Sequence, residues 1–159
     1  MPSGTAHTRI EAALLVLLWT PAVVFSLIRG WAVVSDVLAF DVAYAFSMLF
    51  LSPDLDLRKS KASRRWGVLR WLWAPYALVF RHRRMSHHLL LGPLTRIGYL
   101  GILAVGGVLL TLFLSGRSVV SFTMPINLLF ALLLGLYLPN LTHVLTDRLH
   151  STWQQRKRL

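Results

Sequence analysis

Histidine and aspartate residues stand at the ends of several apolar stretches of this sequence. His143 and Asp147 are four positions apart, so on a helix they would share one face, one turn from each other. Asp54 and Asp56 follow Pro53 directly after an apolar stretch, and extended backbone there would aim both carboxylates to the same side. Imidazole nitrogens and carboxylate oxygens are common ligands of divalent metals. The pattern therefore predicts metal chemistry at the ends of the apolar stretches.

Three further histidines extend this pattern of ligand-type residues. His7 precedes the first apolar stretch, and His82 and His87 precede the third. His82 and His87 are too far apart for one helical turn, so a break near Ser86 would be needed to turn both inward. The predicted metal ligands are thus His7, Asp54, Asp56, His82, His87, His143 and Asp147.

Each candidate ligand also has a simpler explanation. An Asp-x-Asp pair can cap a helix, a histidine such as His143 can be a hydrogen-bonded residue of the membrane interface, and His7 can belong to a disordered N-terminus. His88 and His150 are assigned to supporting or structural positions, although spacing alone does not separate His88 from its neighbour His87. The simpler explanations must account for four separate segments that converge on one edge, which favours a site.

The composition is that of a membrane protein, and the length is that of one domain. The 159 residues are 55% hydrophobic and 14% charged. The first apolar stretch resembles the core of a signal peptide, but we expect it to remain in the mature protein. Only Arg9 precedes it as a positive charge, and no convincing cleavage site follows. We expect an all-α, polytopic membrane protein with a single domain over residues 1–159. Four stretches reach the roughly 17–25 residues that cross a bilayer: Ile10–Ile28, Gly30–Leu51, Ile97–Leu114 and Phe122–Leu138.

The distribution of positive charge predicts the topology. The net charge is +11, and most of the 17 Lys and Arg residues lie between the second and third stretches or after the fourth. The positive-inside rule then places both termini and the central loop in the cytoplasm of a bacterial inner membrane. All the candidate ligands would then lie at the cytoplasmic edge of the membrane, near anionic lipid headgroups. Because topology accounts for the positive net charge, no nucleic-acid partner is expected. The sequence has no cysteine, so a metal would use nitrogen and oxygen ligands.

Residues 66–80 form a shorter apolar segment that Pro75 interrupts. An interfacial or re-entrant helix is expected there. The alternative is a fifth span, which would put His82 and His87 on the opposite face from Asp54. The aromatic residues expected at the headgroup level are Trp66, Trp71, Trp73 and Tyr76.

Two carboxylates, Asp36 and Asp41, lie within the second stretch. Ionised carboxylates are costly inside a membrane, so such residues are expected to be functional or paired. Asp36 can reach the outer interface. For Asp41 we expect protonation or a hydrogen bond to a residue such as Asn127.

Five sequence blocks stand out together: Met1–His7, Ser52–Leu57, Arg65–Tyr76, His82–His87 and His143–Asp147. They resemble the bacterial DUF2227 family of membrane proteins described as metal-binding. The wider relatives are YdjM-like membrane-bound metal-dependent hydrolases, which share a Pro-Asp-x-Asp turn, a His-Arg-x-x-Ser/Thr-His block and a C-terminal His/Asp pair. The resemblance covers Met1 to about Trp153, and its departures are the Arg83-Arg84 run and His88.

The resemblance implies a divalent-metal site formed by the seven candidate ligands. Zinc is expected, with manganese or iron as alternatives, either as one ion that uses part of the set or as two ions about 3.5–4 Å apart. Such a site can supply hydroxide for hydrolysis, with Asp54, Asp56 or Asp147 as general base when it is not a ligand.

Arginines border the predicted ligands and could select the substrate. Their guanidinium groups match phosphate oxygens, although membrane topology and attraction to anionic lipid also explain them. A lipid-like or phosphorylated substrate is therefore expected. The alternative is a non-catalytic protein with a structural, metal-sensing or transport site. The candidate substrate residues are Arg81, Arg83 and Arg84.

Overall fold

The protein is helical throughout the part of the chain that the computed structural model describes, residues 4–56, 60–80, 88–118 and 123–157. No strand occurs among these residues, which confirms the all-α prediction. Four short helices lie between the second and third long ones: η1 (Pro53–Asp56), α3 (Lys61–Arg65), η2 (Gly67–Trp73) and α4 (Ala74–Val79). The four long helices are α1 (Gly4–Arg29), α2 (Trp31–Phe50), α5 (Leu91–Ser115) and α6 (Ile126–Arg156).

The four long helices are long and apolar enough to cross a membrane, as predicted from length and composition. The bounds of three of them differ from the expected spans by several residues, and α5 begins at Leu91 in place of Ile97. Helix α1 already begins at Gly4, so His7 is helical, and α6 begins at Ile126 but continues far past Leu138 to Arg156. Helix α6 continues past the apolar stretch because its more polar part still packs against the rest of the protein, with His143, Val144 and Asp147 buried.

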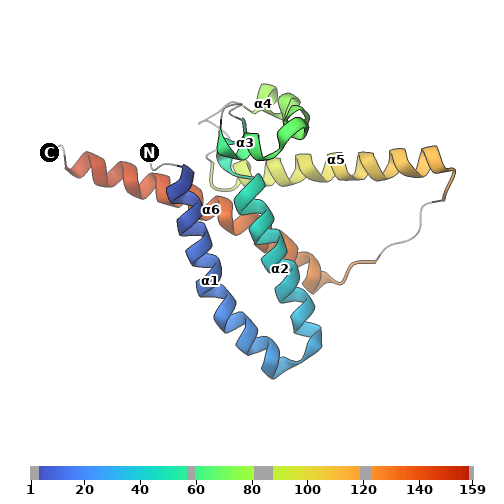
Figure 1. The fold of residues 1–159 in the computed structure, drawn as a ribbon, viewed down its shortest axis with the longest axis horizontal. Helices are drawn as coiled ribbons and strands as arrows, with labels where there is room; N and C mark the ends of the chain where they lie inside the picture. Colours follow the sequence, from blue (N-terminus) through green and yellow to red (C-terminus); the bar gives the residue numbers. More distant parts are fainter. Residues whose placement is uncertain (1–3, 57–59, 81–87, 119–122, 158–159) are drawn as a thin grey trace.

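Helices α1 and α2 form an antiparallel hairpin (Figure 1). Helix α6 packs against α2 from Asp36 to Ser47 and meets α1 near the start of α1. The turn of the hairpin is a single residue, Gly30, with φ of 90°. This left-handed backbone region is strained for residues that carry a Cβ, so glycine suits the turn. Helix α5 points away from the other three long helices (Figure 1). Its buried residues among those described are Gly92, Pro93 and Arg96, all in its first two turns.

Helices α2 and α6 approach each other most closely at Gly135. A Cβ at this position would lie 2.5 Å from the carbonyl oxygen of Phe40 and 2.9 Å from the Cβ of Ala43. Next to this contact, Ser47 donates a hydrogen bond to the Leu136 carbonyl at 2.6 Å, and Asn140 donates to Ser47 at 2.9 Å. The missing side chain therefore sets the distance between the two helices, and a polar bridge fixes their register.

The end of α2 is fixed by side chains that bind its last carbonyl groups. Such carbonyls have no partner within their own helix. Arg65 donates to Leu49 at 2.9 Å and Trp66 to Phe50 at 2.9 Å, both on main-chain oxygens. Arg96 of α5 donates to the third, the carbonyl of Leu51, at 3.0 Å.

Arg96 is buried, although the charge pattern counts it among the basic residues of the central loop. The prediction that Arg96 belongs to a loop is therefore wrong. Helix α5 starts at Leu91 and includes Arg96, whose guanidinium group reaches the end of α2.

The four short helices form a cap at the end of α2 (Figure 1). Each is far too short for the roughly 30 Å bilayer core, so a regular fifth span does not form among these residues. Trp73 and Tyr76 are buried in the cap, in contrast to the wet headgroup position expected for them, and Trp71 is exposed. The buried aromatic rings pack against Leu51 and Leu55, which ties the cap to the turn that carries Asp54.

Substitution of Gly135 by alanine should destabilise the protein. The added methyl group would force α2 and α6 apart, and such overpacking costs about 1–3 kcal/mol. We expect a lower Tm for purified Gly135→Ala in detergent. The matched control is Gly107→Ala in α5, where a Cβ meets no atom within 4 Å. A Tm of Gly135→Ala equal to that of the control would contradict the close approach of the helices.

Candidate metal centre

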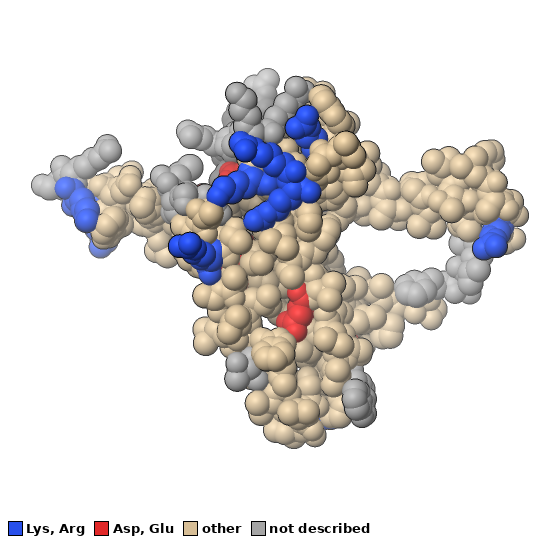
Figure 2. All heavy atoms as spheres, viewed as in Figure 1, with Lys and Arg blue, Asp and Glu red and all other residues tan. Residues whose placement is uncertain are grey.

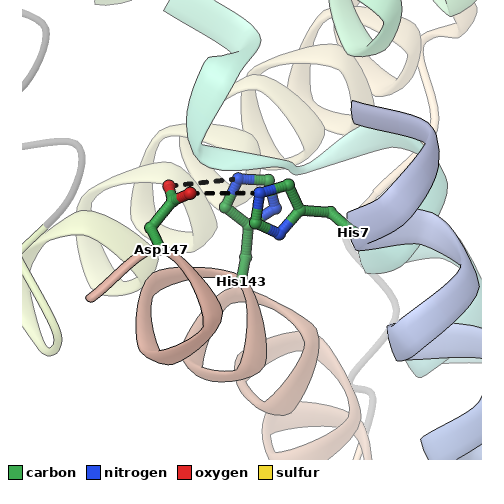
Figure 3. Close-up of side chains that lie close together, drawn as sticks. All are labelled: His7, His143 and Asp147. Atoms are coloured by element: carbon green, nitrogen blue, oxygen red, sulfur yellow. Dashed lines mark hydrogen bonds and ion pairs between the residues drawn. The ribbon is translucent and has the colours of Figure 1, made fainter. Parts of the chain in front are cut away.

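His7 of α1 and His143 of α6 stack on each other where the two helices meet (Figure 3). Their ring centroids are 3.8 Å apart and the ring planes differ by 15°. Both residues are buried, with 4% and 3% of their surface exposed. Two imidazoles from helices far apart in the sequence are thus held side by side away from bulk water.

The carboxylate of Asp147 faces both imidazoles (Figure 3). It lies one turn after His143 on α6, so the i, i+4 spacing brings the two residues to one face. Its Oδ1 is 3.1 Å from Nε2 of His7, and its Oδ2 is 3.9 Å from Nε2 of His143. One ligand atom from each of the three residues lies within 4.8 Å of the others. This is a compact set of two nitrogens and one oxygen.

Glu11 supports the site, and the sequence analysis missed it. It is buried, and its Oε1 lies 3.2 Å from Nδ1 of His143. When Nδ1 carries the proton and donates a hydrogen bond to Glu11, Nε2 of His143 has a lone pair that can bind a metal. The main-chain carbonyl of Glu11 also accepts a hydrogen bond from Tyr44 at 3.0 Å, which ties this part of α1 to α2.

A signal for Glu11 is present in the sequence. Glu11 follows His7 by four positions within an apolar segment, which is the spacing that drew attention to His143 and Asp147.

Asp54 lies at the edge of the cluster. Its Oδ2 is 4.0 Å from Nε2 of His143, and its side chain is 34% exposed. The expected extended backbone at this turn is wrong, because Pro53–Asp56 forms the 3-10 helix η1. With three residues per turn, positions 54 and 56 do not share a face. The two carboxylates are therefore not aimed together by the backbone.

The structure brings together four of the seven predicted ligands: His7, Asp54, His143 and Asp147. Asp56 is within η1, but its side chain lies outside the described part of the chain. The same is true of the whole segment that holds the other predicted ligands and the substrate residues, namely Arg81, His82, Arg83, Arg84 and His87.

The two remaining histidines have structural contacts. His88 is exposed, and its Nδ1 accepts hydrogen bonds from the main-chain N–H groups of Leu90 and Leu91 at 3.3 and 3.2 Å, at the start of α5. His150 pairs with Gln154 on the same face of α6 at 2.9 Å. Both contacts agree with the structural positions expected for these residues.

The donor set fits a divalent metal that prefers nitrogen and oxygen ligands. The two Nε2 atoms converge on one carboxylate, and Glu11 lies within hydrogen-bond distance of Nδ1 of His143, where it would stabilise the tautomer that a metal requires. Nδ1 of His7 is buried without a hydrogen-bond partner among the described residues, so only the His143 ring has such support. His7, His143 and Asp147 are the residues that would hold the ion, with Asp54 beside them.

The fold and the site define a class of protein: an all-α chain with four helices of membrane-spanning length and a buried His/Asp cluster where α1 meets α6. The model of the DUF2227 family, described as an uncharacterized metal-binding protein, matches residues 2–157. The chain therefore belongs to this family.

A curated relative from Aquifex aeolicus (strain VF5), described as an uncharacterized protein, is 46% identical over 61 residues. The aligned part covers 38% of this chain and 43% of that relative, so the chain matches less than half the length of this curated protein. No solved structure matches the chain.

Removal of the Glu11 carboxylate should weaken metal binding while the ligands stay in place. Loss of a group that orients a metal-bound histidine typically costs about 10–100-fold in affinity. We expect that weakening for Glu11→Ala in a Zn²⁺ titration against a competing chelator. Asp36→Asn is the control, because this carboxylate of α2 lies outside the cluster and binds Asn127 of α6. Equal affinities of Glu11→Ala and wild type would remove Glu11 from the site.

Proposed function

We propose that this protein is an integral membrane metalloprotein that holds a divalent metal at the cytoplasmic membrane edge and hydrolyses a lipid-like or phosphorylated substrate there. The observation that supports this most strongly is the buried cluster of His7, His143 and Asp147 with Asp54 at its exposed edge.

The burial of the cluster supports metal binding over a chance contact. Three ionisable side chains and Glu11 are almost fully buried at one place in an apolar molecule. Burial of such groups is unfavourable unless they satisfy one another or coordinate a cation. His7 and His143 come from helices at the two ends of the chain, so the cluster depends on the tertiary fold. Zinc suits two imidazoles and a carboxylate, and manganese or iron are alternatives.

The partly exposed edge of the cluster supports catalysis. A structural zinc site is closed by four protein ligands, whereas a catalytic site has three and keeps an open position. When bound at such a site, a divalent metal lowers the pKa of a water molecule toward neutrality. Asp54 is close enough to the cluster and exposed enough to accept a proton from water there. Asp147 touches both imidazoles and is better suited as a ligand. The sequence blocks similar to YdjM-like metal-dependent hydrolases favour the same chemistry.

The charge distribution supports a substrate with a phosphate or another anionic group. Figure 2 shows Lys and Arg side chains gathered at the end of the molecule that carries the cap, while the lobe below is largely free of them. The exposed basic residues of the described cap are Lys61, Arg64, Arg65 and Arg70. They would face anionic headgroups if α1 and α2 cross the bilayer, and a headgroup ester would then lie near Asp54.

Metal content should depend on the buried imidazoles. We expect that His7→Ala and His143→Ala lose most of the bound metal in elemental analysis of purified protein. The matched control is His150→Ala, which removes a histidine from the same helix as His143 but outside the cluster. Wild-type metal content in both cluster variants would contradict a site at these residues.

Asp54 should separate catalysis from metal binding. For Asp54→Asn we expect metal content near that of wild type and a large loss of activity on a panel of lipid phosphate and carboxylate esters. A wild-type protein that retains its metal and hydrolyses none of these esters would favour the alternative of a non-catalytic structural or sensing site.

The absence of cysteine makes the proposed topology directly testable. Single-cysteine variants at Ser60 and Ser151 should react with an impermeant thiol reagent from the cytoplasmic side of inverted vesicles, and one at Ser115 from the opposite side. Labelling of residues 60 and 115 from the same side would overturn the proposed arrangement of spans.

A further inference from the structure

We propose that the cavity between α1 and α2 binds a protonated amine with an apolar chain, and that the ammonium group pairs with Asp41. This site is separate from the metal centre. Along α1, Glu11 and Ser26 are about 22 Å apart at 1.5 Å per residue, so the two sites lie toward opposite ends of the helix.

The cavity has the size and wall chemistry of a small-molecule site. Its volume is about 400 Å³, within the range of roughly 300–1,000 Å³ that is typical of ligand pockets. The walls are apolar except at two places, where Ser26 and Asp41 contribute oxygen atoms. The lining residues that define it are Trp19, Val23 and Ser26 from α1, and Val34, Leu38 and Asp41 from α2.

Asp41 provides an unsatisfied acceptor at this cavity. Its Oδ1 is buried and has no hydrogen-bond partner among the described residues. The expected bond from Asn127 goes instead to Asp36, whose two oxygens lie 2.9 and 2.8 Å from the Asn127 nitrogen. The expected bond from Asn127 to Asp41 is therefore wrong, because Asn127 lies near the other carboxylate of α2, whereas protonation of Asp41 stays a prediction. A buried acceptor without a donor is costly, which a bound donor would relieve.

The other polar group of the cavity does not supply this donor. The Ser26 hydroxyl donates its hydrogen bond to the carbonyl of Ala22 within its own helix, at 2.8 Å. None of the described lining residues is basic, so no cation of the protein neutralises Asp41 there.

The same surroundings indicate an organic ammonium over a metal ion or a plain lipid chain. One carboxylate in an apolar wall cannot supply the several oxygen ligands that Ca²⁺ or Mg²⁺ requires. A hydrocarbon chain would fill the volume and leave Oδ1 without a donor. An ammonium group satisfies the carboxylate, and the aromatic ring of Trp19 in the same wall can attract the cation.

The test is the thermal shift that n-octylammonium produces in the full protein, purified in a nonionic detergent. Ligand binding to the folded state raises Tm by an amount that increases with the logarithm of the ligand concentration relative to Kd. We expect a saturable rise in Tm for wild type. Asp41→Asn should bind the amine at least about tenfold more weakly, because a charge-assisted hydrogen bond is lost. Asp36→Asn is the matched control on the same helix and should respond as wild type does.

Two further measurements guard the result. Val34→Phe should fill the cavity while Asp41 stays intact, and it should abolish the shift even if Asp41→Asn folds poorly. The response of His143→Ala should equal that of wild type, since the cavity does not depend on the metal centre.

Several outcomes would overturn the amine site. One is an equal shift in wild type and Asp41→Asn, which indicates partition into the detergent. Another is an equal response to n-octanol, which indicates a donor without charge. A larger response to dihexanoylphosphatidylethanolamine than to octylammonium would instead point to a lipid headgroup.

Discussion

The structure depends on a single constraint: ionisable groups buried in an apolar molecule must satisfy one another. Glu11, His7, His143 and Asp147 are all nearly inaccessible to solvent. None could be buried alone without a large desolvation cost. Together they form a continuous chain of contacts, from Glu11 to His143, and from Asp147 to both imidazoles. Because two of these contacts join α1 to α6, they determine where the first helix docks against the last. The same contacts that make burial tolerable also leave the Nε2 atoms turned toward a shared carboxylate, so packing and the capacity to bind metal have one cause.

The end of α2 positions Asp54, the carboxylate at the edge of the cluster, through a different set of contacts. Three carbonyl groups that the helix cannot satisfy are taken by Arg65, Trp66 and Arg96. These donors come from the cap and from α5, so the same hydrogen bonds dock the cap and position the first turns of α5. The turn that carries Asp54 follows immediately and is held by the packing of Leu55 in the cap. Asp54 is thereby brought to the edge of the cluster while its side chain keeps contact with solvent. Buried residues thus fix the position of an exposed one.

The sequence allowed the class of fold and part of the site to be predicted, for physical reasons that differ between residues. The lengths of apolar segments identify the four long helices, and the i, i+4 spacing identifies the shared face of His143 and Asp147. Long-range partners carry no such local signal. The spacing of Glu11 from His7 indicates that the two share a helix face, but it does not identify His143 as the partner of Glu11. Asn127 bonds Asp36, because the choice between two carboxylates on α2 depends on how α6 crosses it. The 3-10 turn at Asp54 likewise follows from packing against the cap, which spacing alone does not encode.

Helix α1 links the two polar places of an otherwise apolar hairpin. Its first turns carry His7 and Glu11, and its second half lines the cavity that Asp41 faces. The residues of α1 that contact α6 through ionisable groups, His7 and Glu11, lie in its first turns, and the rest of the helix runs beside α2. The hydrogen bond from Tyr44 to the Glu11 carbonyl fixes the pairing of α1 with α2 near the start of α1. An ion held by His7, His143 and Asp147 would cross-link α1 to α6 at the point where this hairpin meets the rest of the molecule. Tight docking at the start of α1 is compatible with a cavity beside its second half, because the side chains of the two regions make separate contacts. A metal bound at these residues would therefore anchor α1, and the cavity near the Gly30 turn could accept a ligand without disturbing them.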